Sequence, residues 1–170
     1  YLEKLTRKSI RGGGSGNLGA SNALIRLGWK AGVLVGAHDI GKALLAVYLA
    51  RWLLPQLEYA TVAAGVACVM GHIFPFYLKF RGGKGFASYI GMIFALDWKI
   101  ALVIIALIFA VALITDYIVA ATLMTTLSAP ISIGLHQGRW LVALILCLGS
   151  AVILYRHREN LGRIFITGGE

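Results

Sequence analysis

The sequence has 170 residues, of which 59% are hydrophobic and 14% are charged, and its formal net charge is +9. Soluble domains usually carry about 25% charged residues, so this composition excludes an ordinary soluble domain and is typical of a membrane protein. The cations gather where apolar stretches stop and do not form one surface interleaved with aromatic residues, which argues against nucleic acid as a partner.

Long apolar stretches without the alternation of barrel strands favour helices that cross a bilayer, whose core needs roughly 20 residues per helix. Six stretches fit this pattern: 32–53, 59–78, 85–96, 99–114, 117–135 and 140–155. The third and fourth are short for full crossings, so we expect them to be tilted or extended by flanking residues. The prediction is an all-α fold, a polytopic transmembrane helix bundle of about six spans that forms a single domain over residues 1–170.

The basic residues favour one side of this bundle. An even number of crossings returns the chain to the side where it started, so residues before the first span, after the second and after the sixth share a side. Twelve of the 16 lysines and arginines fall there: Lys4, Arg7, Lys8, Arg11, Arg26, Lys30, Lys79, Arg81, Lys84, Arg156, Arg158 and Arg163. By the positive-inside rule this side is cytoplasmic.

The first polar cluster on that side is GGGSGNLGASN, residues 12–22. Glycines allow backbone N–H groups to approach an anion, and the start of the following helix adds a partial positive charge, so a phosphate would be held well there. The alternative is a flexible glycine linker. The asparagines Asn17 and Asn22 and the serines Ser15 and Ser21 favour the phosphate site.

The second cluster is RGGKG, which precedes the apolar helix starting near Phe86 and offers Arg81 and Lys84 to neutralise an anion. It is not a Walker A loop, because Gly85 stands where that loop needs serine or threonine. GAHDIGKA, residues 36–43, comes closer in spacing but also lacks the hydroxyl residue, so no nucleotide site is expected.

The third cluster is YRHRENLGRIFITGGE, residues 155–170. On a helix, His157 and Asn160 are three positions apart and emerge on one face, where they can share a ligand. The alternative is a basic helix end lying on lipid headgroups, which explains the arginines equally well but gives no reason for His157 and Asn160.

Asp39 and Lys42 are three positions apart inside an apolar stretch, so they can form an ion pair, and such intramembrane groups are functional candidates. The other isolated groups are assigned structural roles: Asp116 as a helix cap, His38 and His72 as core or interface residues, His136 as a loop residue on the opposite side, and Cys68 and Cys147 as small core residues. The carboxylates are scattered, so neither a metal nor another cofactor is predicted.

In this order, SGNLGASN, GHIFPFYLKFRGGKGFAS and RHRENLGRIFITGGE resemble the three signature stretches of the bacterial acyl-phosphate:glycerol-3-phosphate acyltransferase family. Those integral membrane enzymes transfer a fatty acyl group from acyl phosphate to the 1-hydroxyl of glycerol 3-phosphate. They release phosphate and lysophosphatidic acid in the first step of phospholipid synthesis. The resemblance covers the whole chain and implies seven spans, the first of which would lie upstream of YLEKL and leave only a remnant here.

The resemblance also implies which residues act. Catalytic roles would fall to Ser15, Lys84, His157 and Asn160, and substrate binding to Gly16, Asn17, Asn22, Arg26, Arg81, Gly82 and Gly83. The partners would be glycerol 3-phosphate, acyl phosphate and membrane lipid, in a bacterial plasma membrane with the active site on the cytoplasmic side; no oligomeric state is implied.

The chain departs from the family pattern at three positions. In the first motif Ser21 replaces a threonine, and Ile25 holds the arginine position, with Arg26 one residue later. On a helix this offset turns the side chain by about 100°. In the third motif Leu161 replaces an isoleucine, a change of little consequence.

An acyl phosphate is already activated, so positioning and charge stabilisation suffice without a covalent intermediate. The clustered residues assemble no serine–histidine–aspartate triad, and no histidine is followed by four residues and an aspartate. Either His157 is a general base or the donor's phosphate takes the hydroxyl proton; we favour the phosphate.

The rival class is a transporter or channel for a phosphorylated metabolite, which would need its anion site near mid-membrane. Here the cations lie at one interface, with only the Asp39–Lys42 pair deeper. A membrane alcohol phosphotransferase is less favoured, because the three aspartates are widely spread.

Overall fold

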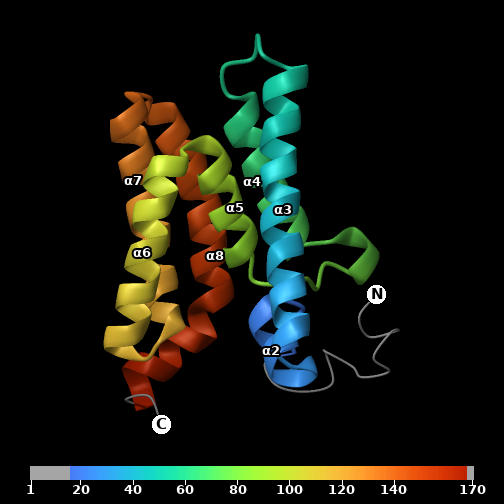
Figure 1. The fold of residues 1–170 in the computed structure, drawn as a ribbon, viewed down its shortest axis with the longest axis vertical. Helices are drawn as coiled ribbons and strands as arrows, with labels where there is room; N and C mark the ends of the chain where they lie inside the picture. The colour runs from blue at the N-terminus through green and yellow to red at the C-terminus, as the bar shows by residue number, and fades with distance from the viewer. Residues whose placement is uncertain (1–15, 168–170) are drawn as a thin grey trace.

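The computed structural model describes residues 16–167, and within this range the chain is helical with no strand (Figure 1). The elements in chain order are α2 (Ala20–Leu27), α3 (Trp29–Leu53), α4 (Ala60–Ile73), the 3-10 turn η1 (Phe76–Leu78), α5 (Phe86–Leu96), α6 (Trp98–Thr115), α7 (Ile118–Gln137) and α8 (Trp140–Thr167). The predicted all-α class is confirmed.

Five stretches of the described chain are long and apolar enough to cross a membrane: Trp29–Leu53, Ala60–Leu78, Trp98–Thr115, Ile118–Gln137 and Trp140–Asn160. The expectation that flanking residues extend the fourth apolar stretch is confirmed, because α6 has 18 residues and includes Trp98 and Thr115. It gains length because the Asp97 side chain caps its start, accepting hydrogen bonds of 3.1 Å from the backbone N–H groups of Lys99 and Ile100. By contrast, α5 has only 11 residues.

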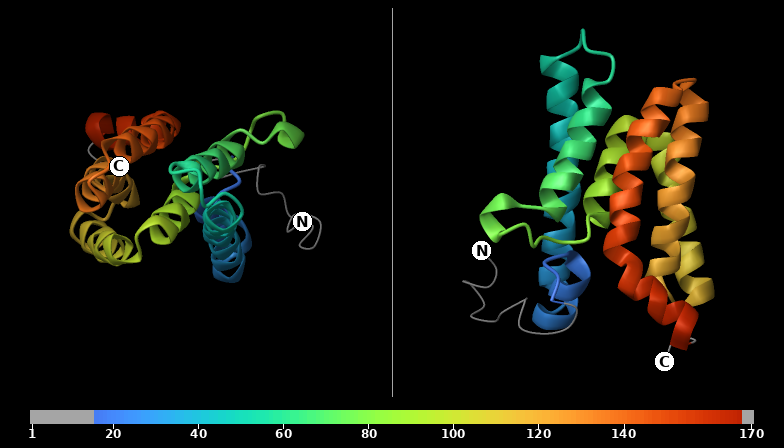
Figure 2. Two further views of the ribbon diagram at one scale, coloured as in Figure 1. Left: turned by 90° about the horizontal axis from the view of Figure 1, so that it is seen from above. Right: turned by 180° about the vertical axis from the view of Figure 1, so that it is seen from behind.

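Successive long helices run in opposite directions. The N-terminal end of α3, the α6–α7 junction and the C-terminal end of α8 lie at the lower end of the bundle in Figure 1, and the α4–α5 connection projects sideways above the level of α2. Seen along the bundle, α5 lies between α3 and α4 on one side and α6, α7 and α8 on the other (Figure 2). All three predicted clusters therefore face the same end of the bundle, as far as the described residues extend.

The short helix α5 packs closely because glycines line its contacts. A β-carbon at Gly91 would overlap the carbonyl oxygen of Ile40 on α3, and one at Gly65 on α4 would overlap Met92 and come within 3.0 Å of Val47. Small residues of this kind let membrane helices approach until their backbones touch. The α3–α4–α5 contact fixes the start of α5, where the second motif ends.

Two expectations for isolated residues need correction, and a third is confirmed. Cys147 is exposed on the outer surface of α8 instead of lying in the core, whereas Cys68 is half-buried. His136 belongs to the last turn of α7 and not to a loop, and its Nε2 lies 3.4 Å from Asp97 Oδ2. Asp116 is the C-cap residue of α6 with a left-handed backbone (φ 60°), which agrees with its assignment as a cap.

Candidate functional site

The second motif forms a loop that folds back on the end of α4. The backbone N–H of Gly82 donates to the carbonyl of Ile73 (3.1 Å), and that of Gly83 donates to the carbonyl of His72 (3.3 Å). A β-carbon at either glycine would overlap these neighbours. Gly82 and Gly83 therefore allow a close backbone approach, and their N–H groups are already used within the protein.

Lys84 joins the second motif to the third. Its Nζ donates to Oδ1 of Asn160 on α8 over 2.7 Å, although the two residues are 76 positions apart. A lysine ammonium carries three N–H donors, and this bond uses one of them. The structure thus brings together two of the residues predicted to be catalytic.

His157 lies one turn before Asn160 on α8 and is 7% exposed. Its Nδ1 lies 2.8 Å from the carbonyl oxygen of Ile153. A carbonyl only accepts, so Nδ1 carries the hydrogen, and in the neutral ring Nε2 is then an acceptor. This tautomer suits a side chain that receives a hydrogen bond from a hydroxyl group.

The start of α5 lies directly after Lys84 and adds partial positive charge. Gly85 is its N-cap residue with a left-handed backbone (φ 88°), and no side chain caps the helix there. Ser88, in the first turn, is fully buried, and its hydroxyl has no hydrogen-bond partner among the described residues. A helix N-terminus with a neighbouring ammonium and an unused hydroxyl suits a phosphate group.

Ser88 and Arg156 are two candidates that the sequence reasoning missed. The Nε of Arg156, next to His157, is buried without a partner in the described part of the chain. The signal for Ser88 was present, because it is the last residue of the quoted GHIFPFYLKFRGGKGFAS motif. Arg156 was assigned only to the interfacial charge, and nothing in its spacing set it apart.

The first motif is described from Gly16 onward, and Ser15 lies outside the described residues. Gly16 has a left-handed backbone (φ 66°), and the Asn22 side chain, which is 2% exposed, donates from Nδ2 to the carbonyl of Asn17 over 2.9 Å. This bond ties the loop to the helix that follows it. Asn17 and Asn22 therefore shape the loop before α2.

The arginine offset in the first motif is resolved by the face of α2. The buried residues of this helix are Asn22 and Ala23. At about 100° per residue, Arg26 lies close to their direction, whereas Ile25 points roughly 110° away from the centre of that face. Both side chains are exposed, Ile25 to 73%, so the helix direction and not burial separates them. Arg26, not Ile25, shares the face that carries Asn22.

The helix α2 is held at the lower end of the bundle by a tight turn onto α3. Gly28, between the two helices, has a left-handed backbone (φ 91°), and a β-carbon at Gly32 would lie 2.7 Å from Cβ of Leu24. The hairpin needs both glycines, one for the turn and one for the close approach. It places the first motif at the same end of the bundle as the C-terminal part of α8 (Figure 1).

Comparison with known proteins gives consistent matches. The family model described as glycerol-3-phosphate acyltransferase matches residues 1–167. A glycerol-3-phosphate acyltransferase of Bacillus cytotoxicus is 37% identical over 155 residues, which cover 91% of this chain and 77% of that protein. One of Nitrobacter winogradskyi is 38% identical over 160 residues, covering 93% and 79%.

The fold is similar to that of PlsY (YgiH), an integral membrane glycerol 3-phosphate acyltransferase. The crystal structure of its glycerol 3-phosphate form superposes with a TM-score of 0.91 at 33% sequence identity, covering 99% of this chain and 84% of that one. The form with lysophosphatidic acid gives a TM-score of 0.87 at 32% identity, with the same coverage.

Proposed function

The chain belongs to the glycerol-3-phosphate acyltransferase family, and from that membership we propose that it acylates the 1-hydroxyl of glycerol 3-phosphate with acyl phosphate as the donor. It is an integral membrane acyltransferase. The products would be lysophosphatidic acid and phosphate. Family membership favours this enzyme over a transporter for a phosphorylated metabolite.

The observation that carries the proposal is the hydrogen bond of 2.7 Å between Lys84 and Asn160. It joins two motifs that are distant in sequence, and it lies beside the start of α5. A reaction in which donor and acceptor each carry a phosphate needs more than one group that neutralises negative charge. Lys84, the α5 N-terminus and Ser88 supply one such site in our proposal.

A second anion-binding region is assigned to the first motif and its neighbours. Ser15, Gly16, Asn17 and Asn22 would form the loop, and Arg26, an exposed residue, would add charge from the side of α2 that carries Asn22. Arg81, which is exposed just before the two loop glycines, would attract the phosphates. Gly82 and Gly83 would act on substrate binding indirectly, by allowing the loop to lie against α4.

The chemical step needs no covalent intermediate. The 1-hydroxyl oxygen of glycerol 3-phosphate attacks the carbonyl carbon of acyl phosphate, and the bond between that carbon and the phosphate oxygen breaks. The released phosphate takes the hydroxyl proton. Before the attack, His157 would orient the hydroxyl by accepting its hydrogen bond at Nε2. As the new carbon–oxygen bond forms, the hydroxyl hydrogen would turn from Nε2 to an oxygen of the donor's phosphate, and Asn160 would hold Lys84 in place.

The active site is assigned to the cytoplasmic face of a bacterial plasma membrane. The basis is charge: Lys30 at the start of α3, Lys79 in the α4–α5 connection and Arg158 near the end of α8 share the lower end of the bundle. Residues 1–170 are treated as one membrane domain. Acyl phosphate would reach the site from the surrounding lipid.

The test is a reaction with purified protein in lipid, given palmitoyl phosphate and glycerol 3-phosphate without added metal. Released phosphate and lysophosphatidic acid, the latter identified by mass spectrometry, should appear in equal amounts. A parallel reaction with the palmitoyl thioester of coenzyme A should give little product. Equal use of the thioester would contradict acyl phosphate as the donor, and no product from either would contradict the proposed reaction.

A further inference from the structure

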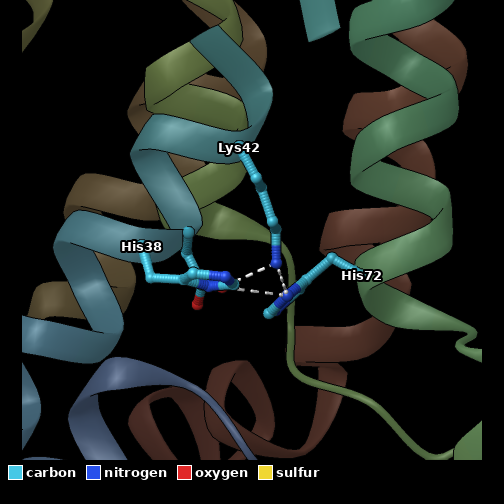
Figure 3. A network of polar contacts seen from close by, with 4 residues as sticks. His38, Lys42 and His72 are labelled. Carbon is cyan, nitrogen blue, oxygen red and sulfur yellow. Dashed lines mark hydrogen bonds and ion pairs between the residues drawn. The ribbon is translucent and has the colours of Figure 1, made fainter. Parts of the chain in front are cut away.

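Three ionisable side chains meet between α3 and α4. The Nζ of Lys42 donates to Oδ1 of Asp39 over 2.6 Å and lies within hydrogen-bonding distance of Nδ1 of His72. The same Nδ1 lies 3.3 Å from Oδ1 of Asp39. Figure 3 shows Lys42 reaching from α3 to His72 on α4. We call Asp39, Lys42 and His72 the α3–α4 polar cluster; the predicted Asp39–Lys42 pair is part of it.

The cluster provides polar partners for side chains that have little access to water. The Asp39 side chain is 5% exposed and that of His72 is 10% exposed, whereas His38, whose Nδ1 is 3.7 Å from Asp39 Oδ1, is 74% exposed and lies at the margin. Burying a charge without a partner is costly. Since a lysine ammonium only donates, Nδ1 of His72 accepts, and the ring hydrogen is on Nε2.

The Nε2 edge of His72 faces the RGGKG loop. A β-carbon at Gly83 would overlap Nε2 of His72, so the backbone of Gly83 packs directly on the ring. The N–H of Gly83 also donates to the His72 carbonyl over 3.3 Å. Lys84 is the next residue. A continuous path of contacts therefore runs from Asp39 and Lys42 through His72 and Gly83 to Lys84.

We infer that the α3–α4 polar cluster is a positioning element for acyl transfer, which holds the His72 ring against Gly83 and so keeps Lys84 where a substrate phosphate binds. The inference rests on the phosphate-binding role proposed for Lys84. Asp39, Lys42 and His72 are positioning residues, because they act through the loop and not on the reacting atoms. The contact of Lys42 with His72 is what joins the ion pair on α3 to the end of α4 next to Gly83.

This role has a kinetic signature. Without the cluster the loop would occupy several positions, and the apparent affinity for the phosphate-bearing substrate would fall in proportion to the competent fraction. Saturating substrate would select the competent position again, so KM would rise while kcat changed little. A merely structural defect would instead lower the amount of active enzyme, which reduces kcat and leaves KM unchanged.

The experiment measures phosphate release by the purified full chain in lipid, with each substrate varied in turn. Lys42→Met keeps the length of the side chain and removes its charge. We expect KM for at least one substrate to rise about tenfold, matching a competent fraction of about one tenth, with kcat within about threefold of the unchanged protein. Lys99→Met, the same substitution on an exposed residue at the other end of the bundle, should change neither.

Three further variants protect the test against misfolding. Lys42→Met leaves Asp39 buried without its partner, so the double variant Asp39→Asn with Lys42→Met removes both charges and should also raise KM. His72→Asn keeps an acceptor near the position of Nδ1 but lacks the ring on which Gly83 packs, so His72→Asn and His72→Leu should both raise KM as Lys42→Met does.

The outcomes separate this inference from the proposed function. Unchanged KM values for both substrates in the double variant and in His72→Leu would overturn the positioning role, whatever happens to kcat. Lys84→Met is measured alongside. If it retained full activity, the phosphate-binding role of Lys84 would fail; if it were inactive while the cluster variants kept their KM, only the cluster's role would fail.

Discussion

The hydroxyl of Tyr89 lies 2.6 Å from the hydroxyl of Ser150, although the two residues are 61 positions apart in sequence and lie on different helices. Tyr89 is fully buried on α5 directly after Ser88, and Ser150 lies on α8 two turns before His157. The bond therefore joins the helix that follows Lys84 to the helix that carries Asn160. It fixes the distance between the two halves of the proposed site from inside the bundle.

Replacing Tyr89 by Phe tests this link. The ring stays, but Ser150 loses its partner, so we expect stability to fall by about 1 kcal/mol, the usual net value of one such bond. For a chain of this size that corresponds to roughly 2–4 °C in Tm, measured by thermal inactivation in detergent. Tyr155→Phe, at an exposed site on the same helix as Ser150, is the control and should leave Tm unchanged. Equal Tm values for both variants would contradict the link.

Much of the fold could be predicted from the sequence, because lipid imposes simple rules. Continuous apolar stretches have to be helices, and the cations mark one end of the bundle. The apolar pattern left the exact start of α6 open, and the Asp97 side chain, which caps the helix, sets it. Cys147 was placed in the core because apolar patterning does not distinguish the core from the lipid-facing surface when both are apolar.

The site could be predicted only in part, because hydrogen bonds between distant motifs leave no mark in sequence spacing. The residue types pointed to phosphate, and the predicted Asp39–Lys42 pair is confirmed. The contact of His72 with this pair depends on how α4 ends. The packing of Gly83 on the His72 ring depends on how the following loop turns back. The glycines were read as phosphate binders for the same reason, since the sequence does not show where their N–H groups go.

Gly83→Ala should disturb the loop. Its new methyl group would overlap the His72 ring, which is held by the α3–α4 polar cluster, so either the ring or the loop has to move. We expect kcat/KM to fall about tenfold or more, corresponding to about 1.4 kcal/mol, in the phosphate-release assay. Gly71→Ala, on α4 with open space around it, is the matched control and should keep full activity. Equal activity of the two variants would show that the close approach is not needed.

Lys84→Met should remove the charge at the start of α5 and leave Asn160 without its donor. Preorganised charge of this kind is worth about 10²- to 10³-fold in rate, so we expect a loss of that size in kcat/KM. Lys79→Met removes an exposed lysine from the same connection and should cost less than about threefold. Losses of equal size in both variants would mean that only the total charge of the loop matters.

Substitutions at both positions can distinguish the role of Arg26 from that of Ile25. Arg26→Ala should lower kcat/KM about tenfold or more, because it removes a cation from the face of α2 that carries Asn22. Ile25→Ala should leave activity unchanged, since the side chain points outward. Adding Ile25→Arg to the Arg26→Ala variant should not restore activity, because the new cation faces away. Restored activity would show that the reaction needs a cation on the side of α2 where Ile25 lies.

The role of His157 is decided by comparing two substitutions across pH. Its Nδ1 is held by the Ile153 carbonyl, so Nε2 is the atom that would meet the substrate hydroxyl. His157→Gln keeps a polar atom near Nε2 and should retain about tenfold more activity than His157→Ala if the histidine only orients the hydroxyl. Both variants should then keep a shallow pH profile, because the donor phosphate takes the proton. Equal and complete loss in both, with activity of the unchanged protein that falls on the acid side of its pH profile, would instead identify His157 as the general base.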